Sequence, residues 1–162
     1  MKEKDYTVKG GHCFEQELSY TCGPSSIRNV LYLMGMPDVE EGHIAELACT
    51  TIDKGTEYYG MVYAIGMLGL VGRIIGNTHV ENLNRHINKG SQAIVDYMSG
   101  PNHNGDGHYS VFVGGNKANV VLADPADGLF KVVDRKWFDR QWFDFNSEGE
   151  RFDKYAIIVR KK

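Results

Sequence analysis

The chain has 162 residues, of which 42% are hydrophobic and 24% charged, a composition typical of a soluble globular domain. With 18 Lys plus Arg, 21 Asp plus Glu and a formal net charge of −3, it lacks the basic excess of proteins that bind nucleic acids or anionic membranes. We therefore expect no nucleic-acid partner. Because no repeat or linker interrupts the sequence, residues 1–162 are expected to form a single domain.

The cysteines and the apolar runs exclude several classes of protein. Three cysteines, Cys13, Cys22 and Cys49, cannot all pair within one chain, and none belongs to a Cys-x-x-Cys unit, which argues against a disulfide scaffold and against a zinc knuckle. The N-terminus lacks the apolar stretch of a signal peptide, and the most apolar run, residues 61–72, is too short to cross a bilayer. We expect a cytoplasmic location and no membrane span in this chain.

Residues up to Gly90 are predicted to be mainly helical, because apolar residues recur three and four positions apart. The first helix is expected from Gly23 to Gly35, the second to begin at the N-cap Asp38, the third at the N-cap Thr56, and the fourth to end at Gly90. The apolar faces are Ile27, Val30, Leu31 and Met34; Ile44, Leu47 and Ala48; Met61, Ala64, Ile65 and Leu68; and Val80, Leu83 and Ile87.

After Gly90 the pattern changes to short runs rich in Val, Ile, Tyr and Phe, which predict strands. These runs are 92–98, 109–113, 119–123, 129–133 and 155–159, with one helix expected over 134–143. Helices followed by an antiparallel sheet indicate an α+β fold. The polar segment 99–107 directly precedes a strand, a place where functional groups are often displayed.

Cys22 is the first candidate for a functional residue. It directly precedes Gly23 and Pro24 at the expected start of the first helix, where the positive end of the helix dipole and the free backbone N–H groups favour a thiolate. Taken alone, such a cysteine is more often a small apolar core residue.

His108 and Asp124 are candidates for an oriented base. The strands 109–113 and 119–123 are joined by a turn that suits a hairpin centred on Asn116. In an antiparallel hairpin, residues equally far from the centre of the turn lie opposite each other. His108 and Asp124 are each eight residues from Asn116, so they are predicted to be directly opposed, with Cβ atoms about 4.5–5.5 Å apart. A shift of the centre by half a residue would place them on opposite faces of the sheet. Paired, Asp124 would fix the tautomer and orientation of a histidine that takes a proton from sulfur.

Gln16, six residues before Cys22, adds an amide donor suited to an oxyanion hole, with the Cys22 backbone N–H as the second donor. The set of Gln16, the segment Cys22-Gly23-Pro24-Ser25-Ser26, the strand that begins Gly107-His108-Tyr109, and the turn Asp124-Pro125 resembles the papain-like cysteine peptidases that include the double-glycine leader peptidases of bacteriocin exporters. The resemblance spans about residues 14 to 142. It implies a papain-like α+β fold, with a helical half packed on an antiparallel sheet, and a thiol-dependent hydrolase acting on a peptide or protein. It also implies that Cys22 is the nucleophile, His108 the general base and acid, Asp124 its orienting group and Gln16 an oxyanion donor.

The resemblance leaves the substrate and the reaction open. Bacteriocin exporters join this domain to membrane spans and a transport ATPase, which are absent from this sequence, so cleavage after double glycine is not implied. The same site would also serve an acyl-transfer enzyme, such as a transpeptidase, peptide ligase or amidase, or survive in a non-catalytic peptide-binding module, although the intact set of four residues argues against a lost activity. A metal site would have to use His79, His86, His103, His108 and Asp106. Because no His-Glu-x-x-His motif supports it, neither a metal nor another cofactor is expected.

Overall fold

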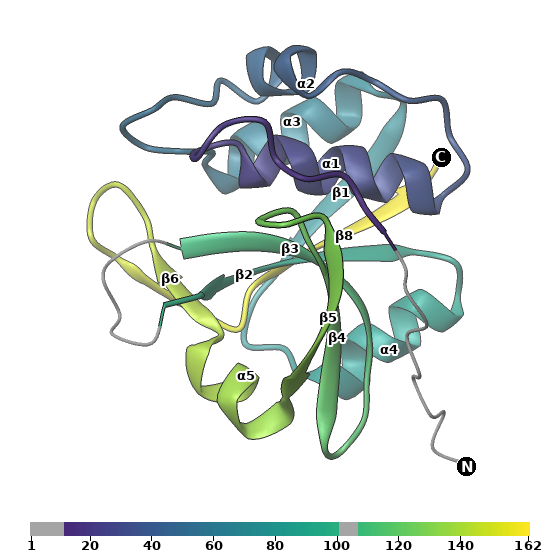
Figure 1. Cartoon of the computed structure of the whole chain (residues 1–162), viewed down its shortest axis with the longest axis vertical. Helices are drawn as coiled ribbons and strands as arrows, with labels where there is room; N and C mark the ends of the chain where they lie inside the picture. Colours follow the sequence, from purple (N-terminus) through teal and green to yellow (C-terminus); the bar gives the residue numbers. More distant parts are fainter. Residues whose placement is uncertain (1–11, 101–106) are drawn as a thin grey trace.

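The structure, a computed structural model, describes residues 12–100 and 107–162. The helices are α1 (Cys22–Leu33), α2 (Glu41–Leu47), α3 (Tyr58–Met67), α4 (Val80–Asn88) and α5 (Arg135–Gln141). The strands are β1 (Leu70–Ile75), β2 (Gln92–Met98), β3 (Gly107–Gly115), β4 (Asn119–Asp124), β5 (Leu129–Asp134), β6 (Phe143–Phe145), β7 (Arg151–Asp153) and β8 (Ala156–Lys161). Figure 1 shows α1, α2 and α3 stacked on one side of the main sheet, and α4 and α5 on the other.

The main sheet has six strands in the order β1-β8-β2-β3-β4-β5, and every neighbouring pair is antiparallel. The predicted α+β class is therefore confirmed. Two elements were not predicted: the edge strand β1, which pairs with β8, and the separate hairpin of β6 and β7. β1 follows directly on the apolar run of α3 after Gly69, whose φ of +82° lets the chain turn between helix and strand.

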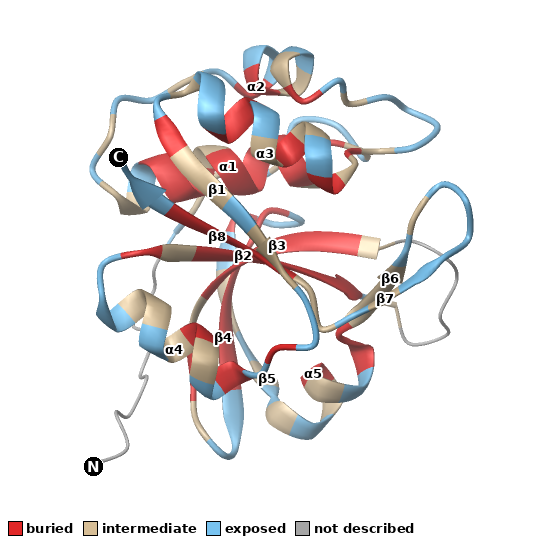
Figure 2. Cartoon of the chain, turned by 180° about the vertical axis from the view of Figure 1, so that it is seen from behind, coloured by how far each residue is buried: buried red, intermediate tan, exposed pale blue. Residues whose placement is uncertain are grey.

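Both faces of the sheet are buried, which explains why its central strands are almost continuously apolar (Figure 2). On β2 the side chain of Ile94 joins the core under α1 to α3, whereas Ala93 and Val95 join the core over α4 and α5. The largest fully buried side chains of the second core are Phe112, Leu83, Leu122, Phe138 and Trp142. In the described ranges no helix combines the length and the apolar character needed to cross a bilayer.

Two predicted helix caps are wrong. Asp38 does not cap α2, because both of its carboxylate oxygens accept hydrogen bonds from the Arg28 guanidinium at 2.8 Å, and the N-cap is Glu40. Thr56 does not cap α3, because its hydroxyl is bonded to the hydroxyl of Thr50 at 2.8 Å, and α3 begins two residues later. In both cases a side chain from the preceding helix or loop binds the group that the local pattern assigned to a cap.

Of the polar segment predicted over 99–107, residues 101–106 lie outside the described residues. Gly107 begins β3, and it stands under the β6–β7 hairpin: a Cβ added there would overlap the carboxylate of Asp144. The absence of a side chain at Gly107 thus leaves room for the carboxylate of Asp144 at the start of β3.

Candidate active site

Cys22 is the first residue of α1, and its thiol is free and half-buried. The next residue is held close to α3: a Cβ added to Gly23 would lie 2.8 Å from Oγ1 of Thr56 and 2.9 Å from Sδ of Met61. The start of α1 can thus pack this tightly only with glycine after the cysteine. The backbone N–H groups of the first helical turn and the positive end of the dipole stabilise negative charge at this position, as the sequence predicts.

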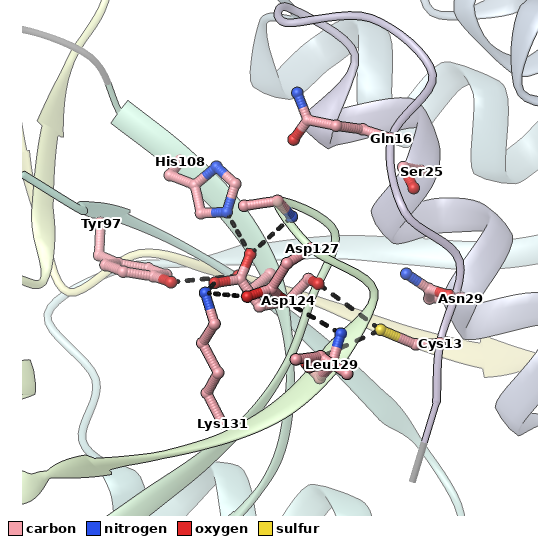
Figure 3. A network of polar contacts seen from close by, with 12 residues as sticks. Cys13, Gln16, Ser25, Asn29, Tyr97, His108, Asp124, Asp127, Leu129 and Lys131 are labelled. Carbon is pink, nitrogen blue, oxygen red and sulfur yellow. Dashed lines mark hydrogen bonds and ion pairs between the residues drawn. The ribbon is translucent and has the colours of Figure 1, made fainter.

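His108 and Asp124 are in contact, with Nε2 of the imidazole 2.6 Å from Oδ1 of the carboxylate and both side chains buried (Figure 3). The contact was predicted, but direct opposition is wrong. Val111 pairs with Ala123, so by extension Asp124 lies opposite Ser110, two residues from His108 on the same face of the sheet. The pair is therefore a diagonal neighbour pair of the ladder.

A β-bulge decides that His108 and Asp124 share a face. Next to the turn, Gly114 pairs with Val121, whereas beyond the bulge Phe112 pairs with Leu122, so Val113 is the extra residue. Without the bulge, the register of the turn would place Asp124 opposite Val111, on the other face of the sheet from His108. The extra residue, Val113, therefore brings Asp124 to the same face of the sheet as His108.

The charges of the pair support each other. Burial lowers the pKa of His108, but hydrogen bonds with Asp124 and Cys22 outweigh burial and raise that pKa to about 9. Burial raises the pKa of Asp124, but the hydrogen bond from His108 outweighs it and holds that pKa well below its ordinary value. Because Nε2 is bound to Asp124, Nδ1 is the ring nitrogen left for the Cys22 sulfur. With a pKa of about 9, the imidazole of His108 is protonated at neutral pH, where it lies against the carboxylate of Asp124.

Lys131 is a member of this site that the sequence analysis missed. Its Nζ lies 2.8 Å from Oδ2 of Asp124 and 3.0 Å from Oδ2 of Asp127, while the backbone N–H of Ala126 donates to Oδ1 of Asp124 at 2.9 Å. Asp124 is thereby held from three sides (Figure 3). Counting paired residues across the hairpin of β4 and β5 would have found Lys131. Leu129 pairs with Asp124, and Lys131 lies two residues further along β5 on the same face of the sheet.

Gln16 lies on a segment that runs along the turn after Asp124. Its backbone N–H donates to the carbonyl of Pro125 at 2.8 Å, and its side-chain Nε2 donates to the carbonyl of Leu18 at 2.7 Å. Figure 3 shows the Gln16 amide apart from the pair of His108 and Asp124. The segment thus reaches the site, and one of the two N–H groups of the Gln16 amide is engaged by Leu18.

Cys13 is the second thiol near Asp124, and its surroundings differ. Its Sγ donates to the backbone carbonyls of Asp124 at 3.6 Å and Leu129 at 3.9 Å. Burial, followed by the negative charges of Asp124 and Asp127, raises the pKa of the Cys13 thiol to about 11. Cys13 is therefore a neutral, hydrogen-bonding thiol.

Of the histidines considered for a metal site, His79 is the N-cap of α4, His86 lies in the last turn of that helix, and His108 is bound to Asp124. His103 and Asp106 lie outside the described residues. Among the residues that are described, no group of three or more His, Cys, Asp or Glu side chains is arranged to hold a metal ion.

A cavity of about 560 Å³ opens beside Cys22. It is bounded by the 52–58 segment, by β2 and β3, and by the β6–β7 hairpin, and it holds the carboxyl groups of Asp96 and Asp144. The sequence analysis did not predict this acidic pair, because Asp96 interrupts an apolar strand and Asp144 follows the expected α5 helix with no local signal that joins them.

The layered α+β fold with a cysteine at the start of its first helix is that of the papain-like cysteine peptidases. The chain belongs to the Peptidase_C39 like family, whose model matches residues 9–150. An uncharacterised protein of Methanothermobacter thermautotrophicus is 35% identical over 126 residues, covering 77% of this chain and 78% of that protein. One of Methanothermobacter marburgensis is 34% identical over 119 residues, covering 72% and 73%.

Solved structures show the same fold. The peptidase domain of Streptococcus ComA, a bifunctional ABC transporter of a quorum-sensing pathway, has a TM-score of 0.72 at 21% identity, covering 93% of this chain and 98% of that domain. A double-glycine-motif protease from an AMS/PCAT transporter, solved with its leader peptide, has a TM-score of 0.67 at 18% identity, covering 95% and 93%. A putative C39-like peptidase from Bacillus anthracis has a TM-score of 0.67 at 17% identity, covering 95% and 98%. The family and fold are thus those of cysteine peptidases.

Proposed function

We propose that this chain is a cysteine peptidase that cleaves a peptide or protein substrate through Cys22, His108 and Asp124, with Gln16 as an oxyanion donor. The observation that carries the proposal is the position of His108, which interacts with the carboxylate of Asp124 through Nε2 and with the thiol at the start of α1. The leader peptide bound to the related transporter protease supports a peptide as substrate.

In the proposed reaction the Cys22 thiolate attacks the carbonyl carbon of the scissile amide. The backbone N–H of Cys22 and the side-chain amide of Gln16 stabilise the negative charge that develops on the carbonyl oxygen. The imidazolium of His108 gives its proton to the leaving amine, and a thioester joins the acyl group to Cys22. Water, deprotonated by His108, then hydrolyses the thioester and restores the thiolate and imidazolium. Asp124 stays ionised throughout and stabilises the imidazolium.

The test is a peptide library incubated with wild type, Cys22→Ala and His108→Ala and read by mass spectrometry. We expect wild type to cleave a subset of peptides, and both variants to lose at least about 10³-fold of that activity because nucleophile and base act together. Cys13→Ala, which removes the neighbouring thiol, should retain it. Cleavage that survives in Cys22→Ala would contradict the proposal.

The same experiment separates hydrolysis from acyl transfer, because the two reactions share the nucleophile and differ in the acceptor. Products that carry a new free carboxylate indicate water as acceptor. Products joined to an added amine would assign the site to a transferase instead.

A further inference from the structure

Cys22 and His108 belong to different layers of the fold. Cys22 begins α1 in the helical layer, whereas His108 is the second residue of β3 in the main sheet, against which α1 packs (Figure 1). The contact between the two side chains therefore depends on how far the start of α1 stands from the start of β3. A misplacement of about 1 Å between reacting groups costs about 100-fold in rate, so a contact that fixes this separation matters for catalysis.

Tyr109, the residue after His108, reaches from the sheet to the helical layer. Its hydroxyl donates a hydrogen bond to the backbone carbonyl of Thr56 at 3.0 Å, and both residues are buried. Burial, and then the negative charge of Asp96, raises the pKa of the Tyr109 hydroxyl well above its ordinary value. The hydroxyl therefore keeps the proton that this hydrogen bond needs, at neutral and at moderately alkaline pH.

Thr56 in turn touches the start of α1. A Cβ added to Gly23, the residue after Cys22, would lie 2.8 Å from Oγ1 of Thr56, so no side chain separates the two segments. The hydroxyl of Thr56 is also hydrogen-bonded to the hydroxyl of Thr50 at 2.8 Å, which restrains it from the other side. Thr56 is thus a fixed point of contact between α1 and the sheet.

These two contacts form a bridge beside the contact of Cys22 with His108. The bridge consists of the sequence neighbours of these two residues, with one residue between them: Gly23, Thr56 and Tyr109. We propose that Tyr109 is a positioning residue, whose hydrogen bond to Thr56 sets the separation of Cys22 and His108. The inference rests on the proposed peptidase function and deepens it, because it assigns what assembles that site across the two layers. Tyr109 itself takes part in no bond-making step.

The test compares two variants that each remove one buried tyrosine hydroxyl close to His108 and retain the ring. Tyr109→Phe removes the hydrogen bond to Thr56. Tyr97→Phe is the matched control, because Tyr97 lies opposite His108 on β2 and its hydroxyl is bonded to that of Ser110, at 3.2 Å, within the sheet. With a peptide selected from the library, Tyr109→Phe should lower kcat by about tenfold or more and leave KM within about twofold. Tyr97→Phe should retain both.

A second measurement follows the contact itself. The hydrogen bond with Cys22 contributes to the pKa of about 9 at His108, so a looser contact lowers that pKa, although Asp124 continues to raise it. NMR titration of protein containing isotope-labelled histidine should therefore give a lower pKa for His108 in Tyr109→Phe than in wild type. The pKa should be unchanged in Tyr97→Phe. A residue needed for stability alone would lower the melting temperature and leave this pKa as it is.

A third variant serves if Tyr109→Phe does not fold, which thermal melts identify. Thr56→Val removes the hydrogen bond to Thr50 at nearly constant side-chain size and so loosens the middle of the bridge. It should lower kcat and the pKa of His108 in the same direction as Tyr109→Phe, by a smaller amount.

The outcomes separate this inference from the proposed function. An unchanged pKa of His108 in Tyr109→Phe, in a protein that cleaves peptides through Cys22, would overturn the positioning role and leave the peptidase intact, whatever the change in kcat. A rise in KM alone would also overturn it and make Tyr109 a wall of the substrate cavity. If the wild type cleaves no peptide, the proposed function fails, and the titration of His108 still decides whether Tyr109 sets its contact with Cys22.

Discussion

Cys13 and Cys22 are both half-buried free thiols, yet they meet Asp124 in different ways. Cys13 meets Asp124 directly, through its backbone carbonyl and its negative charge, and the charge stabilises the neutral thiol. Cys22 interacts with His108, which Asp124 holds as an imidazolium. A carboxylate beside a thiol suppresses the thiolate, whereas the same carboxylate acting through an imidazole supports it.

Asp124→Asn removes the carboxylate that acts on Cys13 directly and on Cys22 through His108. We expect hydrolysis to fall by about 10⁴-fold, because a neutral amide no longer stabilises the imidazolium or fixes the tautomer of His108. The melting temperature should change far less, since Asn retains the shape of the side chain. Turnover and thermal melts of the same preparation check this.

The matched control for Asp124→Asn is Asp127→Asn. It removes the other carboxylate that binds Lys131 and leaves the contact of His108 with Asp124 in place. It should retain turnover within a few-fold. Equal losses in both variants would mean that the negative charge of the turn matters, and not the contact with His108.

Gln16→Ala would sharpen the comparison by separating two reactions of the Cys22 thiolate. Hydrolysis should fall by about 10²–10³-fold, because amide cleavage must stabilise an oxyanion. Alkylation by iodoacetamide forms no oxyanion and should keep its wild-type rate. Glu15→Ala, at an exposed neighbouring position, serves as control. Equal, small losses in both reactions would make Gln16 an ordinary loop residue that positions the turn through its backbone.

The thiols themselves can be compared by alkylation at pH 6 to 7 followed by peptide mapping. We expect Cys22 to react before Cys49, which is exposed, and before Cys13. A pKa of about 11 in place of 9.0 leaves Cys13 with about 100-fold less thiolate at neutral pH than an ordinary cysteine. Its rate should therefore rise about tenfold per pH unit up to pH ~11. Faster labelling of Cys13 than Cys22 in the native protein would contradict the assignment of the nucleophile.

Lys131→Met is expected to have the smallest effect. The Lys131 side chain is more than a third exposed, so solvent screens its ion pair with Asp124, and its loss should lower turnover by about two- to fivefold. Lys131→Arg should restore most of the activity because it restores the charge. A loss as large as that of Asp124→Asn, in a protein with an unchanged melt, would instead place Lys131 in contact with the substrate.

Local patterns of the sequence determined where several helices and strands of this protein begin and end. The start of α1 at Cys22 follows from Pro24 and the apolar spacing after it, and β2 has the predicted bounds 92–98. These features are decided within about ten residues, by helix and strand preferences and by which face must be buried. The contact of His108 with Asp124 was also predictable, because a hairpin brings nearby residues of the chain together.

Only the tertiary structure decided the remaining features, because their partners are distant along the chain. The bulge at Val113 sets the face that Asp124 shares with His108. The prediction centred the hairpin on Asn116 and included no bulge, so it found the contact between His108 and Asp124 but paired the wrong residues of the two strands. β1 is a strand because β8, near the other end of the chain, offers it an open edge. The acid pair of Asp96 and Asp144 exists because a late hairpin folds over the start of β3. No local preference encodes any of these, since each depends on packing between segments that the sequence does not place side by side.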